Sequence, residues 1–140
     1  ISACLVGSEM CIRDRLSSTA ALTGARPDSG AFEKHFSSRE GDAVFLYTWT
    51  SDNAVSARMF APMHGVTEDP ATGSASAAAT AFLAQLVGPA DGEFRLSITQ
   101  GVDMGRPSLI LGNASVAGGK VESVRVGGPS VPVMDGFLTI

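Results

Sequence analysis

Apolar and β-branched runs along the chain predict a fold rich in β-strands. Residues 43–50 read AVFLYTWT, which is typical of a buried strand, and a polar turn at 51–53 leads into a second strand at 54–60 with apolar residues at alternate positions. Further strands are predicted at 94–100, 108–111, 120–126 and 131–140, short helices around 20–22 and 31–36, and loops at 26–30 and 62–70.

One long helix is predicted at 73–87. Its apolar residues recur at the spacing of one helix face: Ala75, Ala78, Ala79, Phe82, Leu83 and Leu86. The opposite face holds further alanines, and no charged residue occurs between Pro70 and Asp91. A helix that is apolar all round is buried on most sides. We therefore expect an α+β fold in which a curved, barrel-like sheet wraps around this central alanine-rich helix.

The first fifteen residues require a separate interpretation. Residues 5–15 read LVGSEMCIRDR, which resembles a sequencing-library adapter translated in frame. We interpret 1–15 as a non-native segment that has no reason to pack, and we place the domain at 16–140. Both cysteines, Cys4 and Cys11, lie in this segment, so the rest of the chain carries no thiol chemistry. We also expect that the native protein continued upstream.

Composition narrows the classes of function. The 140 residues are 44% hydrophobic and 17% charged, which suits one folded domain with a core. The net charge is −4, and the basic residues are neither in excess nor clustered, so a nucleic-acid partner is not expected. No apolar run reaches the roughly 18 residues that span a bilayer, and no signal peptide is recognisable. We expect a soluble, cytoplasmic protein without a membrane partner.

The entrance of the long helix is the best candidate for a binding site. Residues 68–75 read EDPATGSA, and Thr72 is predicted to be the N-cap. The N–H groups of 73–75 are then unpaired within the helix, and with the helix dipole they suit a carboxylate or another anion. Gly73 permits close approach of a ligand to the backbone, and Ser74 adds a hydroxyl. From the residues alone, a plain capped helix remains the alternative.

Other candidate groups surround this entrance. Glu68 and Asp69 stand at its mouth, where a carboxylate close to the dipole and apolar walls can be tuned for proton transfer. His64 is a weaker candidate, because a lone loop histidine is more often simply exposed. Residues 118–120 (GGK) lack the remaining features of a phosphate-binding loop, and no residues have metal-ligand spacing. The segment 100–108 (QGVDMGRPS) is either a tight β connection or a second ligand-facing edge.

Three motifs, in order, resemble the C-terminal half of the phenazine-biosynthesis-like family, which includes an isomerase of trans-2,3-dihydro-3-hydroxyanthranilate. They are RMFAP at 58–62, EDPATGSA at 68–75, and QG followed by MGRPS at 100–108, and the resemblance covers roughly 20–140. It implies a fold similar to that of diaminopimelate epimerase. Such a protein has two alike lobes, each a barrel-like sheet around a central helix, with the active site between them. The resemblance also implies proton transfer without metal or cofactor.

Residue by residue, the resemblance makes Asp69 the candidate catalytic residue and makes Gly73 and Ser74 candidate substrate-binding residues. We add Thr72, the predicted N-cap, to the candidate substrate-binding residues. Glu68 matches the motif without a catalytic role. The main acid/base of the family is a glutamate in a Ser-Glu-Thr context of the first half, near a Gly-His-Pro-Thr stretch. Neither motif occurs in this sequence. We therefore expect half of an active site and no turnover by this chain alone.

The leading hypothesis is the C-terminal part of a cofactor-independent isomerase that acts on a small carboxylate. Its expected partners are that substrate and the N-terminal lobe of the same protein, with a homodimer as one option at full length. Two alternatives stay open. One is a non-catalytic protein that binds small anions or other proteins and retains the fold. The other is an amino-acid epimerase or racemase, which needs a thiol at the helix entrance, where this chain has Ser74.

Overall fold

The computed structural model of the chain describes residues 11–36 and 43–138. In chain order, the elements are β1 (Cys11–Arg15), α1 (Thr19–Gly24), α2 (Ser29–Phe36), β2 (Ala43–Ser51), β3 (Ala54–Ala61), the 3₁₀-helix η1 (Pro62–His64), β4 (Val66–Asp69), α3 (Gly73–Val87), β5 (Gly92–Gln100), β6 (Ser108–Ala117) and β7 (Lys120–Gly127). The three α-helices of the described residues and most of the strands lie where the sequence pattern predicts them.

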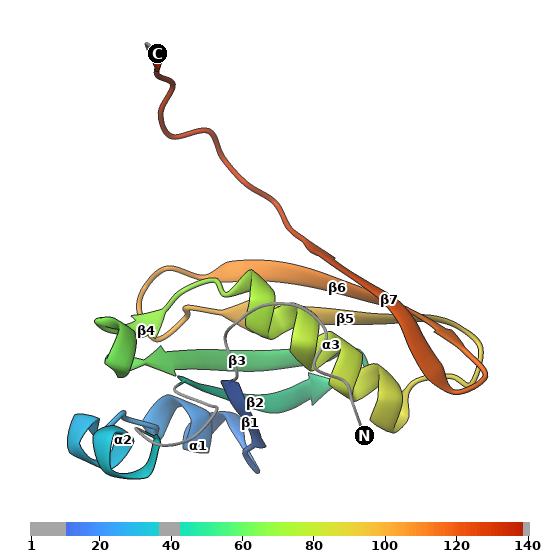
Figure 1. Ribbon diagram of the computed structural model, residues 1–140, viewed down its shortest axis with the longest axis horizontal. Coiled ribbons are helices and arrows are strands. Elements are labelled where there is room, and N and C mark those ends of the chain that lie inside the picture. The colour runs from blue at the N-terminus through green and yellow to red at the C-terminus, as the bar shows by residue number, and fades with distance from the viewer. Residues whose placement is uncertain (1–10, 37–42, 139–140) are drawn as a thin grey trace.

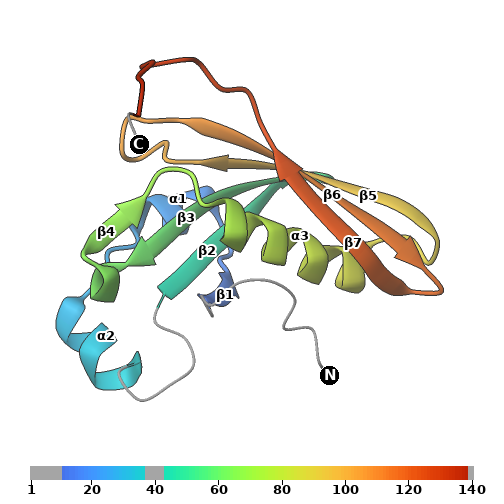
Figure 2. The ribbon, with the colours of Figure 1, turned by 45° about the horizontal axis from the view of Figure 1, so that its top comes forward.

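The strands form one mixed, seven-stranded sheet in the order β1-β2-β3-β5-β6-β7, with β4 paired to β3 beside this path. The pairs β1–β2 and β3–β5 are parallel, and the other pairs are antiparallel. Helix α3 connects the parallel strands β3 and β5 and lies along one face of the twisted sheet (Figures 1 and 2). The α+β class is thus confirmed. Within the described residues the sheet stays open and does not close around the helix.

The buried face of α3 differs from the predicted one, although the predicted bounds are confirmed. The helix contacts β5, β6 and β7. Phe82 and Leu86, expected in the core, are 41% and 61% exposed, so the expectation of a helix buried on most sides is wrong. The buried residues are Ala75, Ser76, Ala79, Thr80, Leu83 and Ala84.

Close packing explains why the small residues are the buried ones. A Cβ built on Gly112 of β6 would collide with the Thr80 side chain, so the helix and the sheet approach each other as far as glycine allows. Bulky side chains cannot enter so narrow a space. The hydroxyl of Thr80 donates to the carbonyl of Ser76 at 2.8 Å, which pairs one polar group within this apolar contact.

Three other expectations are corrected. Residues 66–69, predicted as loop, form β4, which pairs with β3. Residues 131–138 form no strand, and 139–140 lie outside the described residues. The segment Cys11–Arg15, which we expected not to pack, pairs with β2 from Ala43 to Tyr47. Pairing uses main-chain groups, which any sequence offers, so the proposed adapter origin of 1–15 stays a prediction.

Candidate functional site

The entrance of α3 is built around a threonine that does not cap the helix with its side chain. Thr72 occupies the N-cap position, and its carbonyl accepts the N–H of Ser76 at 3.0 Å. Its side chain makes no capping hydrogen bond. Instead, Thr72 Oγ1 donates to Asp69 Oδ2 at 2.6 Å and accepts from Gln100 Nε2 at 3.0 Å. The predicted N-cap position is therefore confirmed, but the hydroxyl is used elsewhere.

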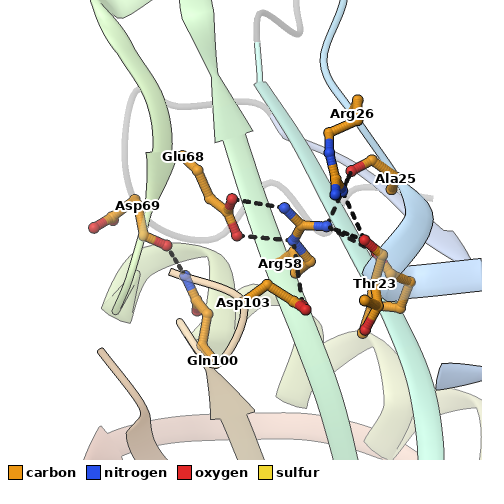
Figure 3. Close-up of polar contacts among 9 residues, drawn as sticks. Thr23, Ala25, Arg26, Arg58, Glu68, Asp69, Gln100 and Asp103 are labelled. Atoms are coloured by element: carbon orange, nitrogen blue, oxygen red, sulfur yellow. Dashed lines mark hydrogen bonds and ion pairs between the residues drawn. The ribbon is translucent and has the colours of Figure 1, made fainter. Parts of the chain in front are cut away.

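Asp69 is held at this entrance at the end of β4. It is half-buried, and besides the bond from Thr72 its Oδ1 faces the N–H of Ala71 at 3.4 Å, a long contact. The main-chain oxygen of Asp69 accepts from Gln100 Nε2 at 2.6 Å, as Figure 3 shows. Side chain and backbone are thus both tied, and the carboxylate has a defined place beside the first turn of α3.

Glu68, the neighbouring acid, is bound by Arg58 of β3. Arg58 Nε and Nη2 donate to Glu68 Oε1 and Oε2 at 2.8 and 2.7 Å, a two-bond pair with both side chains at most 11% exposed (Figure 3). This hydrogen bonding raises the pKa of Arg58, so the guanidinium stays charged. Asp103 Oδ2 lies 3.7 Å from Arg58 Nε. Arg58 Nη1 donates to main-chain oxygens at the end of α1, namely those of Leu22, Thr23 and Ala25.

Successive side chains of a strand point to opposite faces, so Glu68 and Asp69 have different surroundings. Glu68 links β4 to β3 and α1 through Arg58, which agrees with giving it no catalytic role. Sequence reasoning did not identify Arg58 or Gln100 as supports of the entrance. Arg58 lies between the buried Ala57 and Met59 of β3, and Gln100 ends the row of alternate buried positions of β5; both are themselves buried. That position in the pattern is the signal that could have identified them, because buried polar groups require partners.

A hollow of about 440 Å³ lies beside the entrance. Gly73 lines it and is exposed, and a Cβ built on this glycine would meet nothing within 4 Å. The other walls come from Ala71, from the end of the β5–β6 connection with the start of β6, and from the end of β7 with the residues after it; they include Pro107, Ser108, Ile110, Gly127 and Gly128. A larger hollow of about 790 Å³ lies at the other end of α3, near Val87, and none of the candidate site residues line it.

The segment 100–108 is a tight β connection, which is one of the two interpretations that its sequence left open. Gly101 has φ +76°, and a Cβ there would collide with the main-chain oxygen of Arg106 and crowd Pro70. The connection is therefore tight and packs against the turn into α3. Its last residues, Pro107 and Ser108, face the hollow beside Gly73.

The structure brings together Asp69, Thr72 and Gly73 at one end of α3, with Ser74 exposed on the first turn. His64 ends η1 and is exposed. Gly118 and Gly119, both at positive φ, form the turn between β6 and β7, and Lys120 begins β7, as expected of a turn and not of a phosphate-binding loop. Among residues 11–36 and 43–138, no cluster of histidine, cysteine and acids is arranged to hold a metal. No helix in the same ranges is long and apolar enough to cross a membrane.

The chain is similar in sequence to several known proteins. The chain is 45% identical over 93 residues to an uncharacterized isomerase of Mesorhizobium japonicum, covering 66% of this chain and 31% of the relative. It is 34% identical over 125 residues to trans-2,3-dihydro-3-hydroxyanthranilate isomerase of Pseudomonas chlororaphis, covering 89% and 43%. For the Pseudomonas aeruginosa protein of the same name, the identity is 40% over 79 residues, covering 56% and 28%. The chain thus spans less than half the length of each of these relatives.

The fold also resembles a solved structure. The phenazine biosynthesis protein of Bacillus anthracis, of the PhzF family, superimposes with a TM-score of 0.67 at 17% identity, over 76% of this chain and 38% of that protein. The model of the family described as phenazine biosynthesis-like protein matches residues 7–136. The motifs, the fold and this match agree, and the chain belongs to the phenazine biosynthesis-like protein family.

Proposed function

We propose that this chain is the C-terminal part of a cofactor-independent isomerase that moves a proton on a small carboxylate, similar to trans-2,3-dihydro-3-hydroxyanthranilate isomerase. The observation that carries the proposal is the entrance of α3. There the side chain of the N-cap residue leaves the helix uncapped, Asp69 is held alongside, and a hollow opens at Gly73. The names of the relatives supply the reaction class.

The N-terminal end of α3 is the expected binding site for the carboxylate of the substrate. The N–H groups of residues 73–75 and the positive end of the helix dipole favour a carboxylate, and the exposed Ser74 hydroxyl adds a further donor. The walls of the hollow are mostly apolar or glycine, and they suit a small organic body attached to that carboxylate.

The same site can support proton transfer, because it can stabilise the negative charge that the reaction creates. Removal of a proton from carbon places negative charge on the conjugated substrate, and N–H donors that already point at the site stabilise that charge. Asp69 is the candidate acid/base on this side of the substrate, oriented by the Thr72 hydroxyl. A proton leaves one carbon and another is delivered elsewhere, so the overall change needs no oxidant or reductant. The second acid/base is expected from the N-terminal lobe.

The experiment is to recover the upstream reading frame and express the joined protein. Trans-2,3-dihydro-3-hydroxyanthranilate is then incubated with it in deuterated water, and deuterium in the product is measured by mass spectrometry. Isomerised product carrying solvent deuterium is the expected result. Binding of the substrate without turnover would instead favour the non-catalytic anion-binding alternative. If substrate neither binds nor reacts, this proposal is wrong for that substrate class.

A further inference from the structure

We propose that Gln100 is a positioning residue that draws the Thr72 hydroxyl away from α3. It thereby keeps the N–H groups at the helix entrance available to a carboxylate and holds Asp69 beside them. This inference rests on the proposed function. It concerns a residue outside the candidate site residues, at the end of a strand that supports them.

Gln100 is built into the fold at a fixed point. It is the last residue of β5, is fully buried, and pairs with Ala57 of β3 and Ser108 of β6. A buried primary amide must satisfy its donors and acceptor inside the protein. Gln100 does so on the entrance of α3: Nε2 donates to Asp69 O and Thr72 Oγ1, and Oε1 accepts the N–H of Thr72 at 3.3 Å.

The chemistry of these partners fixes the orientation of the amide. The main-chain oxygen of Asp69 can only accept, and the N–H of Thr72 can only donate, so the Gln100 nitrogen and oxygen cannot be exchanged. The single proton of Thr72 Oγ1 goes to Asp69 Oδ2, while a lone pair receives the Gln100 proton. The resulting chain, amide to hydroxyl to carboxylate, is polarised in one direction.

The other two α-helices among the described residues show what this arrangement prevents. Ser18 accepts the N–H of Ala21 at the start of α1, and Asp28 accepts the N–H of Ala31 at the start of α2. A threonine N-cap ordinarily does the same with the second or third N–H of its helix, here those of Ser74 and Ala75. With Gln100 and Asp69 engaging its hydroxyl, Thr72 makes no such bond.

The test uses the ¹⁵N-labelled 140-residue chain, with malonate as the probe. Malonate affinity is measured from the amide shifts of residues 73–75, and hydrogen exchange is measured at Ser74 and Ala75. In Gln100→Met, the freed Thr72 hydroxyl caps the helix. Malonate binding should weaken about fivefold and amide protection should rise about fivefold, the size of one N-cap bond. The control is Gln85→Met, because Gln85 donates to Gly119 O at the far end of α3 and should change neither value.

A double variant distinguishes whether Gln100 positions the Thr72 hydroxyl or only stabilises the fold. Gln100→Met with Thr72→Ala has no hydroxyl left to cap the helix, so both values should return to within about twofold of the parent. If Gln100→Met does not fold, Gln100→Glu keeps the acceptor for the Thr72 N–H and loses both donated bonds, and its exchange rates give the same comparison. A lower melting temperature with unchanged affinity and exchange would overturn the proposal. Absence of malonate shifts in the parent would overturn the anion site itself, while the exchange comparison would still decide whether Gln100 holds Thr72 off the helix.

Discussion

Three separate elements fix the position of one carboxylate at the mouth of α3. Thr72 of the helix bonds the side chain of Asp69, Gln100 of β5 bonds its main chain, and Arg58 of β3 anchors the preceding residue of β4. Such support from outside the site is what keeps a reacting group in a productive geometry. At the residue scale, therefore, removing the charge of Asp69 and removing its supports should have different consequences.

Asp69→Asn should reduce turnover of the joined, full-length protein by roughly 10²–10⁴-fold, the usual contribution of a group acting in proton transfer. Its stability should change little, because the asparagine oxygen can still accept the Thr72 proton. Steady-state rates and thermal melts of one preparation measure both effects. Asp52→Asn, in the exposed turn between β2 and β3, is the matched control and should leave both unchanged. Unaltered turnover in the Asp69 variant would exclude Asp69 from the mechanism.

Arg58→Met should lower the free energy of unfolding by about 3–5 kcal/mol, because it leaves the Glu68 carboxylate without its cation in a site that is 11% exposed. Urea denaturation of the 140-residue chain measures this loss. The control is Arg95→Met, since Arg95 is exposed on β5 and its change should stay within about 0.5 kcal/mol. Equal losses in the two variants would show that the buried pair has no special weight.

The sequence could indicate where Asp69 and Thr72 lie, because capping and dipole rules act within a few consecutive residues. It could not indicate the partners. Arg58 lies 10 positions from Glu68 and Gln100 lies 28 positions from Thr72, and only the pairing of the strands brings them together. Strand β4 was predicted as loop for the same reason. Two adjacent acids, Glu68 and Asp69, indicate a loop in the sequence, because the contact of Glu68 with the buried Arg58 is not visible there.

At the scale of elements, the contact between α3 and β6 decides how the helix is rotated. The bounds of the helix follow from local signals, with Pro70 before it and Gly88 after it. Its orientation does not. The predicted face includes Phe82, and the observed face includes Ser76 and Thr80. The two faces are related by a rotation of about one residue step, or about 100°, around the helix axis. Nearly every position of the helix is apolar or small, so the sequence pattern does not distinguish them. The close approach of α3 to β6 at Gly112 selects the face that consists of the smaller side chains.

Gly112→Ala should therefore destabilise the fold by about 1–3 kcal/mol, the cost of inserting a methyl group into a well-packed contact. Thr80→Ala in the same chain should recover part of that loss, because it removes Oγ1 and Cγ2, the two nearest of the three atoms that the new methyl group would meet. Denaturant midpoints of the two single variants and the double variant form the required cycle. Purely additive losses would contradict a direct contact between these positions.

At the scale of the whole molecule, large apolar side chains remain exposed at several places on the described chain. Phe82, Leu86 and Val87 lie exposed on α3, and Met63 and Val66 lie exposed in the segment before Asp69. Beyond β7 the chain extends away from the body of the protein (Figure 1), with its apolar residues at least 80% exposed: Val131, Val133, Met134, Phe137 and Leu138. Exposed apolar clusters of this kind favour association.

The 140-residue chain should accordingly self-associate and should not isomerise trans-2,3-dihydro-3-hydroxyanthranilate. The second effect follows from the family resemblance, which assigns the main acid/base to a motif that this sequence lacks. The surface responsible for association can be tested by substitution. The double variant Phe82→Gln with Leu86→Gln should shift the chain towards monomer, because it removes the two largest exposed side chains of α3 without touching its buried face.

Sedimentation velocity over a range of concentrations measures the association. Leu111→Gln, a 48% exposed position on β6, is the control and should have the smaller effect. A parent chain that stays monomeric at all concentrations would contradict the role of the α3 surface, and turnover by that monomer would show that its own residues complete the site.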